Sequence, residues 1–159
     1  MKEKIIALLE KDARLTAETM ASMFGTSLAE VEEAINDLEN EGIIVGYKAV
    51  INTELTSSDV VDALIELKVS PQRDKGFGIV AERIRNYPEV KSVYLMSGGF
   101  DLMLMIEGKT MRDIAYFVAE KLATTDGVTA TATHFVLQKY KDNGMIFEKE
   151  KEDKRGNTW

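Results

Sequence analysis

The sequence predicts an α+β protein in two parts, with three helices followed by a β-α-β-β-α-β segment. Apolar residues recur every three or four positions through residues 2–41, which is the period of an amphipathic helix. From residue 60 onward, strand-like apolar runs stand on either side of two further helical patterns. We therefore expect a helical domain at 1–45, a connector strand and linker at 46–59, a mixed domain at 60–138 and a charged tail at 139–159.

Three helices are expected in the N-terminal part, at 2–11, 17–24 and 27–41. Thr16 is a suitable N-cap for the second helix, and Gly25 closes that helix. Ser27 and Glu30 form a capping-box pattern at the start of the third. A short glycine-containing turn between the second and third helices is typical of a helix-turn-helix, here winged-helix-like because strand-forming residues follow. The pattern fits a small helical bundle without a nucleic-acid role equally well.

Runs of β-branched and apolar residues predict a connector strand at 43–52 and further strands at 60–69, 90–96, 102–107 and 128–137. Pro88 stops one helical pattern, at 74–87, and Thr110 caps another that ends near Gly127. The inward stripe of that last helix is expected to be Met111, Ile114, Ala115, Val118 and Leu122. With right-handed crossovers, this order gives a four-stranded antiparallel sheet with both helices on one face, the ferredoxin-like arrangement.

The strand after residue 101 is apolar on both faces. Leu102, Leu104 and Ile106 point one way, and Met103 and Met105 point the other way. A strand with one solvated face would alternate apolar with polar residues, so this sheet is expected to be covered on both sides. The helices cover one side, and a second copy of the chain is the expected cover for the other.

Composition narrows the classes of function. The chain has no cysteine, which excludes disulfides and thiolate metal sites and favours the cytoplasm. No apolar run reaches the length of a membrane span, and the N-terminus lacks a signal-peptide layout. A single histidine, His134, argues against a multi-histidine metal site or a histidine relay, and no ligand role is expected for it. We therefore expect no metal and no cofactor.

The negative charge is concentrated in the first third of the chain. The formal net charge is −7, and residues 1–47 hold ten acidic side chains against four basic ones. No lysine or arginine lies between Arg14 and Lys48, whereas seven acidic residues do. This part of the chain is poorly matched to a phosphate backbone.

Taken together, the helix-turn-helix pattern, Gly46-Tyr47 in the connector and the turn Gly98-Gly99-Phe100-Asp101 resemble the leucine-responsive regulatory protein (Lrp/AsnC) family over nearly the whole chain. The resemblance implies a transcriptional regulator that binds double-stranded DNA. It also implies a C-terminal domain of the RAM type, which pairs sheet against sheet into homodimers and often octamers. A small effector, commonly an amino acid, is expected to bind near the hairpin turn.

On this resemblance, the third helix is the recognition helix. The expected DNA-contacting residues are Thr26, Ser27, Ala29, Glu33, Asn36 and, at the flank, Lys48. The sequence departs from the family here, since cations usually lie along this helix. We therefore expect DNA binding that is weak per subunit and unusually salt-sensitive. The alternative is a relative that does not bind DNA, whose acidic N-terminal domain binds a protein and whose C-terminal domain senses a metabolite.

The expected effector site comprises Ser97, Gly98, Gly99, Phe100 and Asp101, with Thr131 and Thr133 of the last strand. Glycine amides can approach a carboxylate closely, and Asp101 can hold an ammonium group, which suits an amino acid. The structural alternative is that the glycines only make the turn and Asp101 caps it. Threonines in a strand are also simply good strand formers.

An enzymatic alternative comes from siroheme decarboxylases, which have a similar two-part architecture and use histidines near their substrate. The hairpin here contains no histidine, and one histidine in the chain leaves little acid–base machinery. The protein is therefore expected not to be an enzyme.

Overall fold

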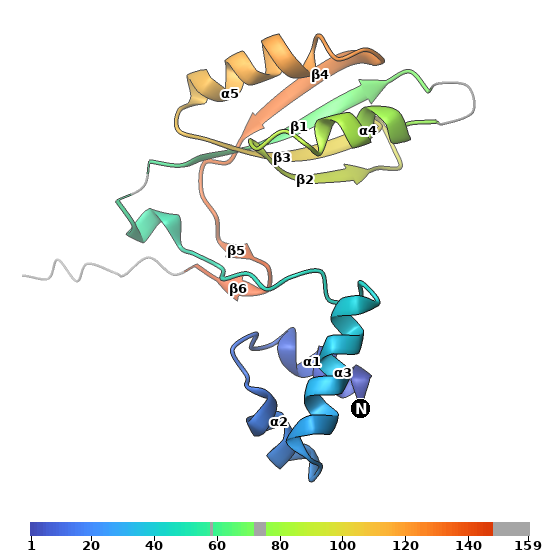
Figure 1. The fold of residues 1–159 in the computed structure, drawn as a ribbon. Coiled ribbons are helices and arrows are strands. Elements are labelled where there is room, and N and C mark those ends of the chain that lie inside the picture. Colours follow the sequence, from blue (N-terminus) through green and yellow to red (C-terminus); the bar gives the residue numbers. More distant parts are fainter. Residues whose placement is uncertain (58, 72–75, 148–159) are drawn as a thin grey trace, which may run out of the picture. The chain divides into compact units, whose positions relative to one another are not determined.

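The computed structural model describes residues 1–57, 59–71 and 76–147, and the chain divides into two compact units, Met1–Val50 and Ile51–Trp159 (Figure 1). Within the described ranges, no helix is both long enough and apolar enough to cross a bilayer.

The first unit contains three helices, α1 (Lys2–Leu9), α2 (Ala17–Phe24) and α3 (Leu28–Asn40). The predicted caps are confirmed: Thr16 accepts a hydrogen bond from the backbone N–H of Thr19, and Gly25 adopts a left-handed conformation with φ of 66°. Helix α1 ends two residues before the predicted boundary, because the chain turns at Asp12, whose carboxylate accepts from the Arg14 N–H. The core of the unit is formed by Ile5, Met20, Ala21, Val31, Ala34 and Leu38.

The expected connector strand at 43–52 pairs with no other strand in the described part of the chain. The backbone N–H groups of Ile43 and Ile44 both bond back to the Leu38 carbonyl, which closes α3 instead. An extended segment becomes a strand only through a pairing partner, and this segment finds none among the described residues. A short 3₁₀ helix, Thr53–Leu55, follows it.

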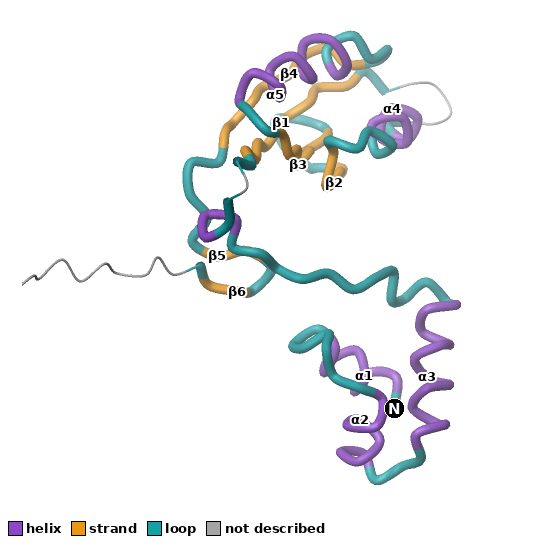
Figure 2. Tube along the Cα trace, turned by 60° about the vertical axis from the view of Figure 1, so that its left-hand side comes forward, coloured by secondary structure: helices purple, strands orange, loops and turns teal. Residues whose placement is uncertain are grey.

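The second unit is built on a four-stranded antiparallel sheet with strand order β2-β3-β1-β4. The elements are β1 (Val61–Val69), α4 (Gly78–Ile84), β2 (Val90–Leu95), β3 (Leu102–Gly108), α5 (Met111–Phe117), the π-helical turn Val118–Leu122 and β4 (Val128–Phe135). Helices α4 and α5 lie on one face of the sheet, as Figure 2 shows in a second view. The predicted ferredoxin-like arrangement is confirmed.

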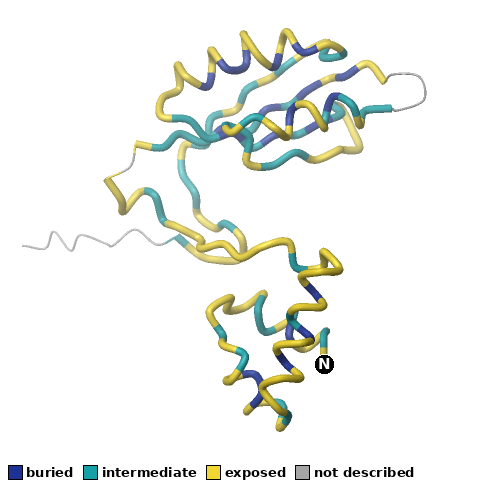
Figure 3. The backbone as a smooth tube through the Cα atoms, in the orientation of Figure 1, coloured by how far each residue is buried: buried dark blue, intermediate teal, exposed yellow. Residues whose placement is uncertain are grey.

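The core of this unit lies between that face and the two helices (Figure 3). Ile65 of β1 stands opposite Leu104 of β3, and both are fully buried. The predicted inward residues of β3, Leu102, Leu104 and Ile106, are all buried. Residues that stand opposite each other in an antiparallel pair share a face, so the register places this row under the helices.

The opposite face of the sheet carries no helix among the described elements. Met103 and Met105 are half-buried there, and Leu64 stands opposite Met105. On the neighbouring strand, His134 is exposed and its Nε2 lies 3.3 Å from the Glu66 carboxylate. The two-faced character predicted for β3 is therefore confirmed, and the sheet of a single chain leaves open a face on which Leu64, Met103 and Met105 lie among charged side chains such as Glu66.

Two boundaries and the buried side of one helix differ from expectation. Strand β4 ends at Phe135, and α4 begins at Gly78, while the start of the helix predicted at 74–87 falls partly outside the described residues. In α5, Met111 and Ala115 are exposed instead of facing inward. Phe117 takes the inward position, because its ring packs edge-to-face against Tyr87 with centroids 5.4 Å apart.

A short hairpin at the start of the charged tail was not expected. Strands β5 (Lys141–Asp142) and β6 (Met145–Ile146) are joined by Asn143 and Gly144, which have φ of 46° and 80°. Positive φ at both central residues is the geometry of a type I′ turn, and Asn-Gly is its strongest sequence signal. The rest of the predicted tail, residues 148–159, lies outside the described residues.

Candidate DNA-binding helix and effector turn

The N-terminus of α3 is fixed by a hydrogen-bond network around Glu30. The Glu30 carboxylate accepts from the Ser27 N–H at 3.0 Å, from the Ser27 hydroxyl at 2.8 Å and from the Thr26 hydroxyl. In return, the Ser27 hydroxyl accepts from the Glu30 N–H, which completes the predicted capping box. These bonds, first of all the one from Thr26, lower the pKa of Glu30 to about 2. Thr26 and Ser27, predicted to contact DNA, therefore use their hydroxyl groups to cap the helix.

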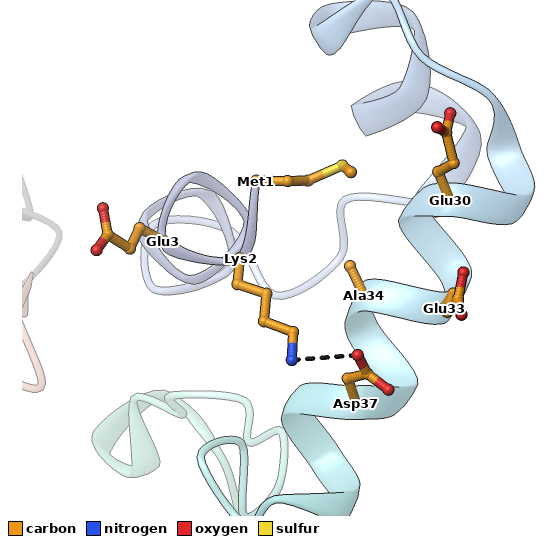
Figure 4. A pocket seen from close by; sticks show the side chains of 7 residues that line it. All are labelled: Met1, Lys2, Glu3, Glu30, Glu33, Ala34 and Asp37. Carbon is orange, nitrogen blue, oxygen red and sulfur yellow. Dashed lines mark ion pairs between the residues drawn. The ribbon is translucent and has the colours of Figure 1, made fainter.

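Two more acids of α3 are paired with a cation from α1. Lys2 Nζ lies 3.1 Å from Asp37 and 2.7 Å from Glu41, and Figure 4 shows the lysine reaching from α1 to Asp37. Hydrogen bonding to Glu41 and then to Asp37 raises the pKa of Lys2. Lys2 is therefore not free to act as a flanking phosphate contact. Its charge is used to neutralise the side of α3.

A fourth acidic residue of α3, Glu39, is hydrogen-bonded by a residue of the connector that follows the helix. The Tyr47 hydroxyl donates to a Glu39 carboxylate oxygen at 2.9 Å. Burial, followed by this hydrogen bond to Glu39, raises the pKa of Tyr47. Among the described residues, Glu32 and Glu33 are left as the acids of α3 without a hydrogen bond or ion pair.

The outward face of α3 is defined by the residues opposite its buried side. Val31, Ala34 and Leu38 are buried against the rest of the unit. At about 100° per residue, the positions opposite them are Ala29, Glu33, Asn36 and Asn40, all exposed. Three of these four were predicted as DNA contacts from the sequence. Asn40 was not among the predicted contacts, although its spacing of four residues from Asn36 places it on the same face.

A hollow of about 460 Å³ lies beside this face, between the start of α1 and α3 (Figure 4). Four of the seven residues that line it are acidic. The lining consists of Met1, Lys2, Glu3, Glu30, Glu33, Ala34 and Asp37. Carboxylates repel phosphate, so this hollow is not suited to the DNA backbone. The exposed cations of the unit without an ion pair in the described structure are Lys4, Lys11, Arg14 and Lys48.

The hairpin turn of the second unit is tied to the end of β1 through Asp101. Its carboxylate oxygen Oδ2 accepts from the Val69 N–H at 2.8 Å, and its own N–H donates to the Leu67 carbonyl at 2.9 Å. The Asp101 carbonyl accepts from the Met96 N–H and closes the turn. The structural role weighed for Asp101 is therefore present, but it joins two strands instead of capping the turn alone. Its second oxygen, Oδ1, has no partner among the described residues.

The backbone of the turn leaves a run of free donors. The N–H groups of Ser97, Gly98, Gly99 and Phe100 make no hydrogen bond within the described structure. The turn is largely exposed, and Gly98 has φ of 128°, which favours glycine. Successive free N–H groups form a concave site for an anion such as a carboxylate.

The two threonines predicted for this site lie elsewhere. Thr131 and Thr133 stand opposite Leu67 and Ile65 of β1, on the face that the helices cover. Strand β1 separates them from β3 and the turn. Ser97–Asp101 therefore lie together in one turn, whereas Thr131 and Thr133 are apart from it within the sheet, as their strand propensity also predicts.

Comparison with known proteins defines the class. Residues 1–45 match the winged helix-turn-helix DNA-binding model, and residues 62–146 match the Lrp/AsnC ligand binding domain. A DNA-binding domain joined to a ligand-binding domain defines a ligand-responsive transcriptional regulator. The chain belongs to the Lrp/AsnC family of transcriptional regulators.

Individual relatives agree over most of their length. The chain is 45% identical over 153 residues to YugG of Bacillus subtilis, an uncharacterised HTH-type transcriptional regulator, covering 96% of this chain and 92% of that one. A regulator from Neisseria meningitidis, solved as a complex with L-Met, is 26% identical with a TM-score of 0.71, covering 89% and 90%. The leucine response regulatory protein LrpA of Mycobacterium tuberculosis, 22% identical, shares the fold with a TM-score of 0.76, covering 89% and 94%.

Proposed function

We propose that this regulator binds its operator through the outward face of α3 and senses an amino acid at the Ser97–Asp101 turn. The observation that carries the proposal is which acidic side chains of α3 are bound to a partner and which are not. Glu30, Asp37, Glu39 and Glu41 are each held by a partner within the first unit, and the charge of Lys2 offsets part of the charge of Asp37 and Glu41. The outward side of α3 then carries polar side chains and two carboxylates without a partner in the described structure, Glu32 and Glu33.

The phosphate contacts are assigned to the flanks of the helix. The proposed contacts are the backbone amides at its N-terminus, Lys48 after it, and the exposed cations Lys4, Lys11 and Arg14. Thr26 and Ser27 contribute through the cap geometry that orients those amides. Few cations mean few released counterions, so each subunit binds weakly, and binding through an oligomer compensates.

The effector is proposed to bind in the turn by its two charged ends. The free N–H groups of Ser97–Phe100 suit its carboxylate, and the unpartnered Oδ1 of Asp101 suits its ammonium group. The Neisseria relative solved with L-Met supports an amino acid as the ligand class and makes L-Met the first probe.

The assembly is proposed to be a homodimer through the open faces of the two sheets. Leu64, Met103 and Met105 give that face an apolar centre. Thioether side chains adapt to an opposing surface, which suits such an interface. We assign the protein to the cytoplasm, where its DNA partner lies, and assign it no catalytic role, because His134 pairs with Glu66 instead of facing the turn.

A second candidate function rests on Glu32, Glu33 and the acidic hollow beside them. A surface of this kind suits a basic protein better than DNA. In that case, the first unit would dock a protein partner, and the second unit would still sense a metabolite.

A titration of the protein with its own promoter fragment across a salt series, with and without L-Met and a panel of other amino acids, tests the proposal. Salt-dependent binding that an amino acid alters is the expected result. A folded oligomer that binds no DNA at the lowest salt would favour the protein-docking function instead.

A further inference from the structure

We propose that Glu33 and Asn36 read two neighbouring base pairs in the operator, with Glu33 selecting cytosine and Asn36 selecting adenine. The inference rests on the proposed function, because it requires α3 to enter the major groove. It goes further by naming the sequence that the helix selects.

The geometry of α3 places the two side chains in one row. Glu33 and Asn36 are three residues apart, so they are neighbours on the helix surface, and both are exposed. They are separated by about 4.5 Å along the helix axis. Successive base pairs are separated by about 3.4 Å, so the two side chains can meet adjacent pairs. Ala29 lies one turn before Glu33 on the same face.

The chemistry of the row limits what it can recognise. A carboxylate accepts a hydrogen bond from the N4 amino group of cytosine, and an asparagine side chain bonds adenine through N6 and N7. A small apolar side chain such as Ala29 fits the methyl group of thymine. Guanine is read mainly by arginine or lysine, and α3 contains neither. The helix is therefore built for cytosine, adenine and thymine on the strand that it faces.

Glu33 is selected because four other acids are held by partners and Glu32 lies farther from the centre of the outward face. Glu30, Asp37 and Glu41 have partners, and Glu39 accepts from Tyr47. Glu32 is also free, but it lies about 100° around the helix from Glu33 and borders the line through Ala29, Asn36 and Asn40 from the other side, farther from that line than Glu33. It therefore provides a control of the same charge at the neighbouring position.

The carboxylate of Glu33 has opposite effects on affinity and on discrimination. In the groove, it repels the phosphates and weakens binding to every sequence. Opposite guanine or thymine, which present no donor in the major groove, it also finds no partner and is left desolvated, which penalises those sequences further. Removal of Glu33 should therefore strengthen binding to random DNA and weaken selection.

The test is selection from a random double-stranded DNA pool at low salt, using the full-length wild type and the E33A, E32A and N36A variants. The wild type should select a C·G pair next to an A·T pair, each preferred by about tenfold or more. E33A should lose the cytosine preference and bind random DNA more tightly. E32A should also bind random DNA more tightly but keep the cytosine preference, and N36A should lose the adenine preference only.

Two results would overturn the inference. One is E33A that retains the cytosine preference of the wild type. The other is that the E32A and E33A variants change the affinity and the selected sequence to the same extent, which would mean that Glu33 acts through its charge only. A wild type that binds no DNA at all would instead remove the proposed function.

Discussion

One carboxylate oxygen of Asp101, Oδ2, accepts a hydrogen bond from the backbone N–H of Val69 at a distance of 2.8 Å. The two residues are 32 positions apart, and the bond joins the β2–β3 turn to the end of β1. It lies where the pairing of β1 with β4 shifts register, between Lys68 and Val69. A residue that the motif points to as an effector ligand therefore also holds the turn in place. Experiments on Asp101 must separate these two roles.

Replacement of Asp101 by alanine and by asparagine separates them. D101A removes the acceptor and leaves a partly buried N–H unpaired, so it should cost about 1–3 kcal/mol of unfolding free energy. D101N keeps an acceptor oxygen for Val69 and should be destabilised less. It removes the charge, however, so it should lose affinity for L-Met. Urea unfolding and calorimetry measure the two effects, and D101N that binds L-Met as tightly as the wild type would refute the ammonium role.

Lys2 is expected to support DNA binding without touching DNA. K2A frees the carboxylates of Asp37 and Glu41, which then repel the phosphates. We expect about a two- to fivefold loss of DNA affinity at low salt, shrinking as salt screens the charges. K109A changes the net charge by the same amount, and Lys109 is exposed in the second unit without an ion pair in the described structure. A loss in K109A equal to that in K2A, measured by fluorescence anisotropy, would show that the ion pairs have no specific role.

Glu30 makes the stability of the first unit depend on pH in an acidic window. Its hydrogen bonds lower its pKa from the usual 4.5 to about 2, so the stabilisation is fully present above pH 4.5 and is lost as pH falls to about 2. The difference in unfolding free energy between the wild type and E30Q should therefore be constant above that window and shrink within it. Urea denaturation of both proteins from pH 7 downward checks this. E32Q is the matched control, because Glu32 makes none of these hydrogen bonds in the described structure. A difference in unfolding free energy between the wild type and E30Q that does not vary with pH would contradict the lowered pKa of Glu30.

The open sheet face should be the dimer interface. M105K places a charge beside Leu64, in the centre of that face, and should shift the protein from dimer to monomer. M111K places the same charge on the exposed surface of α5 and should leave the assembly unchanged. Sedimentation velocity compares them, and M105K that sediments with the wild type would exclude this interface.

Much of the fold follows from local sequence signals. Thr16, Ser27 and Thr110 each cap the helix that they were predicted to cap, because a cap depends on residues within one turn. The alternation in β3 likewise specified its buried face. The Asn143-Gly144 turn carried an equally strong signal, but the surrounding charged tail made it easy to overlook.

The remaining features depend on contacts that sequence patterns do not encode. Lys2 meets Asp37 and Glu41 across at least 35 residues, so counting charges along α3 overstated how acidic its surface is. The bond from Val69 to Asp101 is equally remote in sequence. The sequence alone allowed Thr131 and Thr133 to lie near the turn. The strand order excludes that position, because β1 lies between β4, which carries the threonines, and β3, which leads into the turn.

The most direct test of the account is a titration of a fluorescent promoter fragment with the full chain, beginning at low ionic strength and repeated with L-Met. We predict weak binding that falls further as the salt concentration rises and that changes when L-Met occupies the Ser97–Asp101 turn. A folded, oligomeric protein with no affinity for the fragment at any salt concentration would contradict the central claim that α3 is a DNA-reading helix.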